Sequence, residues 1–356
     1  TFLHTMRSNH DGFVHPFERD SVYSAVLSPK VASITYEDDT FDLSGGIDLV
    51  NFGFGELHNS VSNFGRVNSL HPGHSYDQGV IMARYRHYLD DDTLSYTVMP
   101  IDMVSPHPVE SNRWKGIGST GYPSLPDGSS VADIETTAID IKMKNIRHLV
   151  QYDAIRSGYD YYGFAALGPS PYSVIRQVRL GEYERFNPLA LQIGAGVDTV
   201  YGSHKLYTDI MYQHTDNLLD ENFIRGTVGG IFKESIWVKN YGINEISLTT
   251  EYAFDVITQK QNDKSDLIFS SEESRSGRNT LLGRIEFDID NYWKASLGST
   301  YNLTDNDRSD SLGIRYKEND SLKLYFVGTR FKGDDGSQFG AQRENDLIEL
   351  GFKISF

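Results

Sequence analysis

The last ten residues of the chain, Leu347 to Phe356, read LIELGFKISF. Apolar side chains fill every second position of this stretch, at Ile348, Leu350, Phe352, Ile354 and Phe356, and the residues between them are Glu, Gly, Lys and Ser. Successive side chains of a β-strand point to opposite faces of the sheet. The end of the chain is therefore predicted to be a strand with one apolar face and one polar, partly charged face.

The same alternation recurs upstream, at residues 246–256 and 284–289. A soluble β-sandwich shows alternation of this kind as well, so the pattern alone leaves two architectures open. The apolar-faced segments run for about ten residues or more, which is the length needed to cross a bilayer at a tilt, whereas strands of globular proteins average about five or six. Segment length therefore favours a membrane-spanning sheet.

The connections between these segments alternate between short and long along the chain. Short polar connections lie at 37–40, 90–92, 201–203, 290–291 and 318–320, and long ones near 54–77, 104–133, 168–188, 259–279 and 332–344. Barrels of the bacterial outer membrane have short periplasmic turns and long extracellular loops. We therefore predict one all-β domain over residues 1–356, an antiparallel up-and-down transmembrane β-barrel.

Counting strands gives a further test, because single-chain bacterial barrels have an even number. Fifteen strands are predicted from the pattern, at 24–36, 40–53, 78–89, 93–103, 134–145, 149–167, 189–200, 204–216, 223–234, 245–258, 280–289, 292–303, 310–317, 321–331 and 345–356. Residues 1–9 are the one remaining place for a sixteenth strand. A hidden turn at Gly158 and the long connection 235–244 leave fourteen or eighteen open.

Composition excludes several classes of function. The chain has no Cys, so disulfides, thiolate zinc sites and a Cys nucleophile are all absent. Acidic residues outnumber basic ones by 49 to 33, for a net charge of −16, which argues against nucleic acid as a partner. Mean hydropathy is −0.43, as in soluble proteins, but only every second residue of a barrel strand meets lipid.

The two ends of the chain bear on export. No charged-then-apolar leader begins at Thr1, so an exported protein of this sequence is expected to have lost its signal peptide already. Phe356 closes the apolar face of the last strand. We interpret this terminal aromatic residue as the assembly signal that the barrel-assembly machinery reads, and we expect the mature chain in the outer membrane, with lipid around it.

The segment from Phe41 to Met103 resembles an outer-membrane barrel family of largely unassigned function, related in pattern to alginate-export-type porins. The matching residues are Gly46, Asn51-Phe52-Gly53, Asp91-Asp92-Thr93-Leu94 and Val98-Met99-Pro100. Ile47 and Phe52 stand where that family has Arg and Trp. The resemblance implies passage or export across the outer membrane and leaves the cargo open.

Little in the sequence points to a reaction. His71, His74, Ser75 and Asp77 fall in one predicted outer loop, but their spacing matches neither a nucleophile elbow nor a zinc-binding HExxH motif. The acidic turns lack the ligand spacing and central Gly of an EF-hand loop. We therefore expect no enzyme activity, no cofactor and no metal.

The polar face of the strands carries the remaining candidates. If that face is inward, acidic side chains cluster on four consecutive strands and basic ones on the last strands, so that charges of opposite sign face each other across a lumen. The predicted pore-lining residues are Arg84, Arg86, Lys142, Lys144, Asp198, Asp209, Glu251, Asp255, Arg284, Glu286, Arg315, Lys317, Lys323 and Lys353.

Two functions of different classes remain. The leading hypothesis is a channel or porin that passes small polar solutes or an exported product through a charged lumen. The alternative is a non-conducting structural or binding barrel, in which the inner charges form ion pairs and the long loops dock a lipoprotein, a periplasmic assembly or an external ligand. The oligomeric state stays open.

Overall fold

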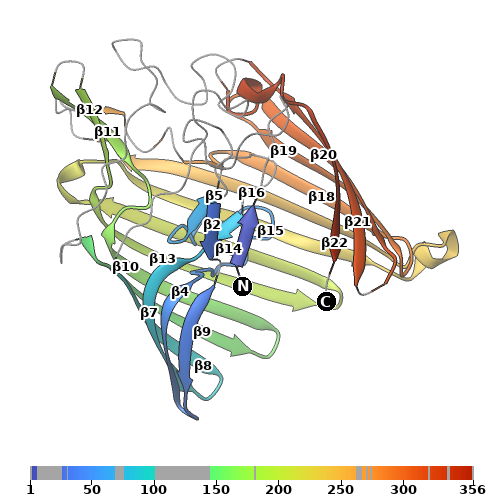
Figure 1. Ribbon diagram of the computed structural model, residues 1–356, viewed down its shortest axis with the longest axis horizontal. Coiled ribbons are helices and arrows are strands. Elements are labelled where there is room, and N and C mark those ends of the chain that lie inside the picture. The colour runs from blue at the N-terminus through green and yellow to red at the C-terminus, as the bar shows by residue number, and fades with distance from the viewer. Residues whose placement is uncertain are drawn as a thin grey trace.

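A computed structural model describes residues 2–5, 26–29, 31–68, 76–100, 145–179, 182–261, 267–269, 272, 275–319, 321–334 and 337–354. Fifteen strands form one antiparallel sheet, in the order β22-β21-β20-β19-β18-β16-β15-β14-β13-β10-β9-β8-β7-β4-β3. The sheet curls along its length (Figure 1). Strands β7–β9 and β19–β22 form its two sides, and β13–β16 lie between them.

The strands of this sheet are β3 (Ala32–Glu37), β4 (Phe41–Asp48), β7 (Val80–Leu89), β8 (Asp92–Met99), β9 (Arg147–Arg156), β10 (Tyr159–Pro169), β13 (Leu189–Tyr201), β14 (His204–Thr215), β15 (Asn222–Glu234), β16 (Glu245–Gln259), β18 (Thr280–Asp288), β19 (Trp293–Asn302), β20 (Asp307–Lys317), β21 (Leu322–Lys332) and β22 (Leu347–Ile354). Each pairs with its neighbour in an antiparallel ladder, as in the hairpin of β21 and β22.

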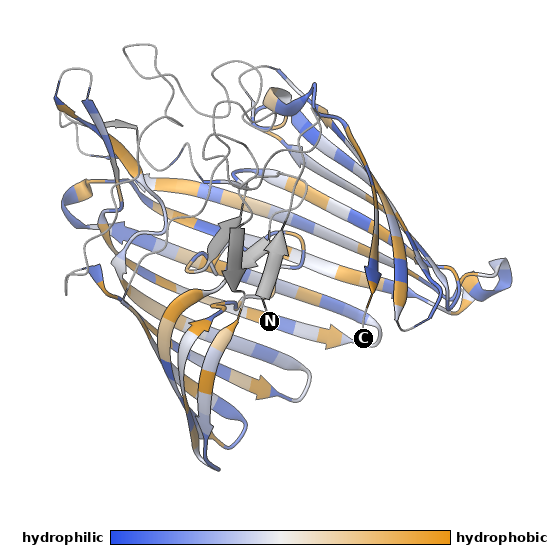
Figure 2. Ribbon diagram, viewed as in Figure 1, coloured by the Kyte–Doolittle hydropathy of each residue, from blue (hydrophilic) through white to orange (hydrophobic). Residues whose placement is uncertain are grey.

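Alternation in the sequence appears in the strands as alternation in burial. In β14, Tyr207, Asp209 and Met211 are buried, whereas Leu206, Thr208 and Ile210 are exposed. Apolar and polar bands alternate along the strands in the same way (Figure 2). We call the face that carries Asp209 the inner face and the opposite, apolar face the outward face. The architecture is an antiparallel up-and-down sheet that curls as the wall of a β-barrel does, as the alternation predicted.

Four of the predicted strand assignments need correction. The span 24–36 is divided into Val26–Pro29, which lies outside the large sheet, and β3. The span 149–167 is a hairpin rather than one strand, because Gly158, with φ of +92°, turns the chain between β9 and β10. The predicted strand 134–145 falls almost wholly outside the described residues, and β8 pairs directly with β9, which leaves no place for a strand between them. Phe2–Thr5 (β1) pairs with Val26–Pro29 (β2) in a separate two-stranded sheet, not as a sixteenth strand of the large one.

The connections lie at the two ends of the sheet, and the five long connections predicted from the sequence share one of these ends. At one end of the sheet, turns such as 90–91, 157–158 and 202–203 join neighbouring strands, and 235–244 is a longer turn that holds the 3-10 helix η7 (Trp237–Tyr241). The other end carries the connections 49–79, 100–146, 170–188, 216–221, 260–279, 303–306 and 333–346. No helix in the described part of the chain is long and apolar enough to cross a membrane.

Several short elements belong to the long connections. They are β5 (Arg66–Asn68), β6 (Tyr76–Gln78), β11 (Val174–Arg179), β12 (Glu182–Phe186), β17 (Leu267–Phe269), η6 (Asp216–Leu218) and η9 (Gly340–Gln342). Strands β12, β11 and β17 form a small sheet of their own, so connections 170–188 and 260–279 are tied together at this end of the molecule.

The apolar core lies inside the curl of the sheet, not between two layers. Val50, Phe52, Val61 and Phe64, all from the connection 49–79, pack against inner-face residues of the sheet. Those partners are Val80, Met82, Met99, Leu149, Tyr162, Phe164, Ala166, Met211 and Phe223. The first part of the β4–β7 connection therefore folds inward, and we call residues 49–65 the inner loop.

Candidate functional site

The inner loop is fixed to the sheet through its backbone. Five consecutive N–H groups, from Phe54 to His58, donate to two carboxylates on the inner face. Asp209 accepts from Phe54 at 2.9 Å and Gly55 at 2.8 Å, and Glu251 accepts from residues 56, 57 and 58 at 2.6, 2.9 and 2.8 Å. Hydrogen bonds to an ionised acceptor are about twice as strong as neutral ones, so this clamp holds the loop firmly.

The two carboxylates of the clamp are buried and come from β14 and β16. Each also accepts a phenol hydrogen bond at 2.6 Å, Asp209 from Tyr162 and Glu251 from Tyr207. A buried carboxylate is costly unless its oxygens are hydrogen-bonded. Backbone amides and phenols meet that need here.

The shape of the inner loop depends on two small devices. Asn59 closes it internally, because its side-chain amide donates to the Phe52 carbonyl at 2.6 Å and its Oδ1 accepts from the N–H of Ser62 at 2.8 Å. Gly55 permits a close approach within the loop, since a Cβ there would lie 2.2 Å from the His58 carbonyl oxygen. A side chain at position 55 would force the amides away from the clamp.

His58 ends the clamp in a partly buried position beside Arg225 of β15. Arg225 Nη2 lies 3.2 Å from His58 Nε2 and 2.9 Å from the Ser276 carbonyl oxygen, and Nη1 bonds the Tyr172 hydroxyl. Burial, and then the charge of Arg225, lower the pKa of His58 to about 3. Because a guanidinium only donates, Nε2 is the acceptor and the neutral ring carries its proton on Nδ1.

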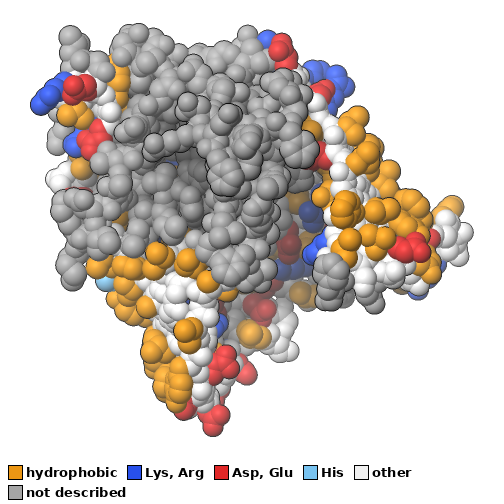
Figure 3. Space-filling model, viewed as in Figure 1, with side chains coloured by type: hydrophobic (Ala, Val, Ile, Leu, Met, Phe, Trp, Pro, Cys, Tyr) orange, Lys and Arg blue, Asp and Glu red, His pale blue; other side chains and the backbone are white. Residues whose placement is uncertain are grey.

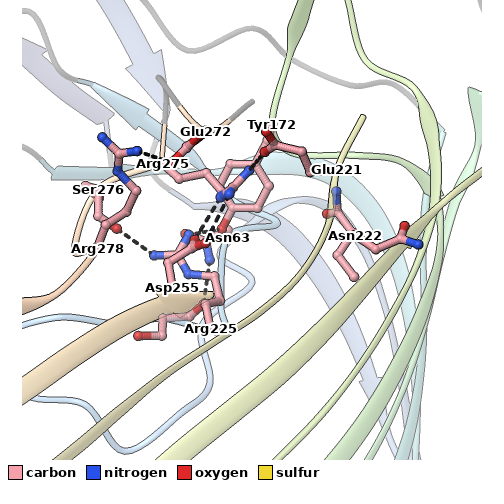
Figure 4. Close-up of polar contacts among 12 residues, drawn as sticks. Asn63, Tyr172, Glu221, Asn222, Arg225, Asp255, Glu272, Arg275, Ser276 and Arg278 are labelled. Carbon is pink, nitrogen blue, oxygen red and sulfur yellow. Dashed lines mark hydrogen bonds and ion pairs between the residues drawn. The ribbon is translucent and has the colours of Figure 1, made fainter. Parts of the chain in front are cut away.

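A second buried contact ties connection 260–279 to the same wall (Figure 4). Arg275 binds Asp255 with two nitrogens, Nε at 2.8 Å and Nη2 at 3.0 Å, and reaches Glu221 with Nη1 at 3.2 Å. Its guanidinium also lies 3.9 Å from the centre of the Phe223 ring. The side chain of Arg275 is fully buried, so this contact anchors the connection inside the curl of the sheet.

The described members of the predicted pore-lining set all lie on the inner face, because residues directly opposed in the ladders share a face. They are Arg84, Arg86, Asp198, Asp209, Glu251, Asp255, Arg284, Glu286, Arg315, Lys317, Lys323 and Lys353. Lys142, Lys144 and the predicted assembly signal Phe356 lie outside the described residues.

The acidic part of that set is occupied by protein partners. Asp209 and Glu251 hold the inner loop, Asp255 holds Arg275, and Asp198 forms an ion pair with Lys205 at 3.0 Å. Arg84 and Arg86 likewise have acidic neighbours on β4, Asp48 at 4.0 Å and Asp42 at 2.9 Å. The expected free acidic wall is thus an anchoring surface for loops.

The basic part of the set is arranged differently. Lys317, Lys323 and Lys353 stand directly opposite one another in a single row across β20, β21 and β22. Glu349 is on the same face but four residues from Lys353, about 13 Å along the strand, so it does not lie in this row. Arg315 lies two residues from Lys317, and neither it nor Lys323 forms an ion pair with another described residue.

A cavity of about 520 Å³ lies between the inner loop and the basic strands. Glu56 of the loop lines it on one side, and its inner-face lining includes Lys233, Glu245, Ser247, Arg284, Glu286, Lys294, Ser296, Arg315 and Tyr325. Charged side chains also show in the recess between the two sides of the sheet, while hydrophobic ones gather on the outer flanks (Figure 3). The described structure therefore combines a polar interior, an inward loop and open space beside it.

The sequence pattern placed the clamp carboxylates Asp209 and Glu251 on the inner face but did not single out the residues that surround them. Tyr162, Tyr207 and Arg225 have inward parity on their strands, and that signal was available. The sequence could not show that the backbone amides of residues 54–58 bind the two carboxylates, since every residue but Pro carries such an amide. Among the described residues, no group of three or more His, Asp or Glu side chains is arranged to hold a metal ion.

Comparison with known proteins gives a fold likeness only. No protein-family model matches the chain, so the resemblance to alginate-export-type porins is not confirmed, and no curated protein matches it either. Similar solved structures include a Rh. blastica porin mutant, with 10% identity, TM-score 0.42 and coverage of 91% of this chain and 88% of that one. Pseudomonas aeruginosa OccK8 (OprE) has 8% identity, TM-score 0.42 and coverage of 84% and 75%.

Proposed function

We propose that this protein is a passive outer-membrane channel for small polar solutes, with a preference for anions, in which the inner loop narrows the lumen. The observation that carries the proposal is the row of Lys317, Lys323 and Lys353 on the inner face. Cβ atoms of directly opposed residues in a ladder are about 5 Å apart, and like charges placed there destabilise the sheet. A row of positive charge on the inner face also raises the local concentration of anions beside it.

The contrast between the two sides of the interior supports the same reading. On β13–β16 the carboxylates accept hydrogen bonds from amides, phenols and arginines, whereas β20–β22 carry four basic side chains on the inner face, of which Arg315 lines the cavity. Clefts lined by one sign of charge raise the local concentration of counter-ions. Anions are therefore expected to be drawn along the β20–β22 side, with the clamped loop opposite.

The test is a measurement of ion selectivity in planar bilayers. The wild type should conduct and prefer anions in a salt gradient, and the double variant Lys317→Gln with Lys323→Gln should shift the reversal potential toward cations. The shift should weaken near 1 M salt, where screening falls to about 3 Å. Lys233→Gln is the matched control, because Lys233 also faces inward but forms an ion pair with Glu245 at 3.4 Å. Equal selectivity in all three proteins would refute the proposal.

A non-conducting barrel that docks a lipoprotein, a periplasmic assembly or an external ligand is the second candidate. One observation favours it: Arg275, Asp255 and Glu221 form a fully buried group that fixes connection 260–279 within the curl of the sheet. A buried ion-pair group of this kind would hold a plug in place inside the sheet. Folded protein that stays silent in bilayers would favour this candidate over the channel.

A further inference from the structure

The outward face carries charged side chains near the long-connection end of β20 and β21. Arg308 lies 3.0 Å from Asp310, and Arg330 lies 3.9 Å from Asp346. Lys332, directly opposite Arg308, is exposed and forms no ion pair with a described residue. Three cations thus stand against two carboxylates, on a chain whose net charge is −16. On a face that meets lipid, charge is tolerated only near the interface.

An apolar groove of about 500 Å³ on the outward face adjoins this cationic group. Its floor is one cross-strand row, Gly230, Thr250, Gly283 and Ser299 on β15, β16, β18 and β19. Larger side chains flank the floor, namely Leu206, Val228, Phe232, Tyr252, Leu281 and Tyr301. Beyond Ser299 the same row continues to Asp310 and Arg330.

Ser299 links the two features, because it lines the groove and its hydroxyl donates to Asp310 at 2.8 Å. Neighbouring strands are about 4.8 Å apart, so the floor from Gly230 to Ser299 is about 14 Å long. The row meets β15 near its short-turn end and β21 near its long-connection end. The groove therefore descends from the cationic group across the apolar face, as the chain of an amphiphile would.

We propose that this surface binds one phosphate-bearing lipid of the leaflet at the long-connection end of the barrel. Arg308, Arg330 and Lys332 take the phosphate, and one acyl chain lies in the groove over Thr250 and Gly283. Arginine is suited to phosphate because its planar donors can bind two oxygens at once. The inference does not depend on channel activity, only on the outward face meeting lipid.

Charge decides between a lipid and a second copy of the chain as the occupant. A two-fold interface brings the same patch of both subunits together, and here it would bring two groups of surplus positive charge face to face. A phosphate supplies the missing negative charge instead. The groove fits an acyl chain and the cationic group fits a phosphate, so an anionic amphiphile would occupy both features at once.

The test is native mass spectrometry of the purified full chain in a neutral detergent, titrated with dilauroyl phosphatidic acid. Dilauroylglycerol, with the same chains, and inorganic phosphate probe the two halves of the site separately. The wild type should bind phosphatidic acid at least tenfold more tightly than either probe. Arg330→Gln combined with Lys332→Gln should weaken that binding about tenfold, as should Gly283→Phe, which fills the groove.

Two control variants are available in the chain. A Cβ at Gly283 meets nothing within 4 Å, and the same holds at Gly45, on the outward face of β4, so Gly45→Phe is the matched control. Lys239→Gln, in the turn at the opposite end, controls for charge. Folding is checked by heat-modifiable gel mobility, and Lys332→Gln alone replaces the double variant if that one does not fold.

Three results would overturn the proposal. Gly283→Phe and Gly45→Phe could bind phosphatidic acid equally tightly, which would show that the groove does not hold the acyl chain. Inorganic phosphate could bind as tightly as the lipid, which would leave a simple anion site. A wild-type oligomer that Gly283→Phe dissociates would show that a second copy covers this face.

Discussion

Replacing Glu251 with Gln should loosen the inner loop while leaving the sheet folded. The isosteric amide keeps the size of the side chain but loses the charge that three amides, at 2.6, 2.9 and 2.8 Å, and the Tyr207 hydroxyl now share. A hydrogen bond to a charged group contributes about 1.5–3 kcal/mol and a neutral one about 1. Losing that difference at three amides weakens the clamp by about 3 kcal/mol.

The measurement is hydrogen exchange of the amides of residues 54–58, followed by mass spectrometry of peptides that cover the inner loop. A loss of about 3 kcal/mol corresponds to exchange roughly a hundredfold faster at residues 56–58, because 1.4 kcal/mol is a factor of ten. Exchange in β13–β16 should not change. In a conducting channel, the current should also become larger or noisier.

Glu286→Gln is the control, since Glu286 shares the inner face but contacts only Arg284, at 3.6 Å, among the ion pairs of the described residues. If Glu251→Gln fails to fold, Tyr207→Phe offers a milder change, because it removes one hydrogen bond to Glu251 and leaves the charge in place. Unchanged exchange at residues 56–58 in folded Glu251→Gln would refute the clamp.

Three further predictions concern the outward face, His58 and the last residue of the sequence. Leu297→Lys, on the outward face midway along β19, should lower the unfolding free energy in vesicles by about 2–4 kcal/mol. Ser296→Lys, which points into the cavity, should lower it far less. Equal losses of unfolding free energy would mean that the inner and outward faces are assigned the wrong way round. The pKa of His58 lies near 3 in the folded protein and near 6.5 in the unfolded chain. Between these two pH values the unfolded state binds more protons than the folded state. The free energy of unfolding should therefore fall by about 1.4 kcal/mol per pH unit as the pH drops through this window. His58→Gln should remove this part of the slope in urea unfolding, and an unaltered slope would contradict the burial of a neutral ring. Phe356→Ser should block assembly without blocking synthesis, as read by heat-modifiable mobility and surface labelling, and normal amounts of folded protein would rule out an assembly signal at this residue.

The sequence by itself determined the fold class and the orientation of the strand side chains. Period-two alternation is a local property, fixed by the pleat, so residues such as Leu350, Glu251 and Lys323 could be assigned to a face without knowledge of their neighbours. The alternation of short and long connections is equally local in origin. Strand number was less secure, because the pairing of β8 with β9 joins segments that are distant in sequence, and because the local turn at Gly158 interrupts a span that the pattern assigned to one strand.

What only the tertiary structure decided is which charges are free and which are bound. Asp209 and Glu251 meet the amides of residues 54–58 across about 150–200 positions of chain, and no pattern in either segment announces the other. Arg275 finds Asp255 only because connection 260–279 folds back into the curl of the sheet. Cross-strand register likewise aligns Lys317, Lys323 and Lys353 in one row. It also places Arg330 in the same row as Ser299, which lines the outward groove. Parity places a side chain on a face, but the loops that cover that face and the strands that adjoin it determine what the side chain can bind.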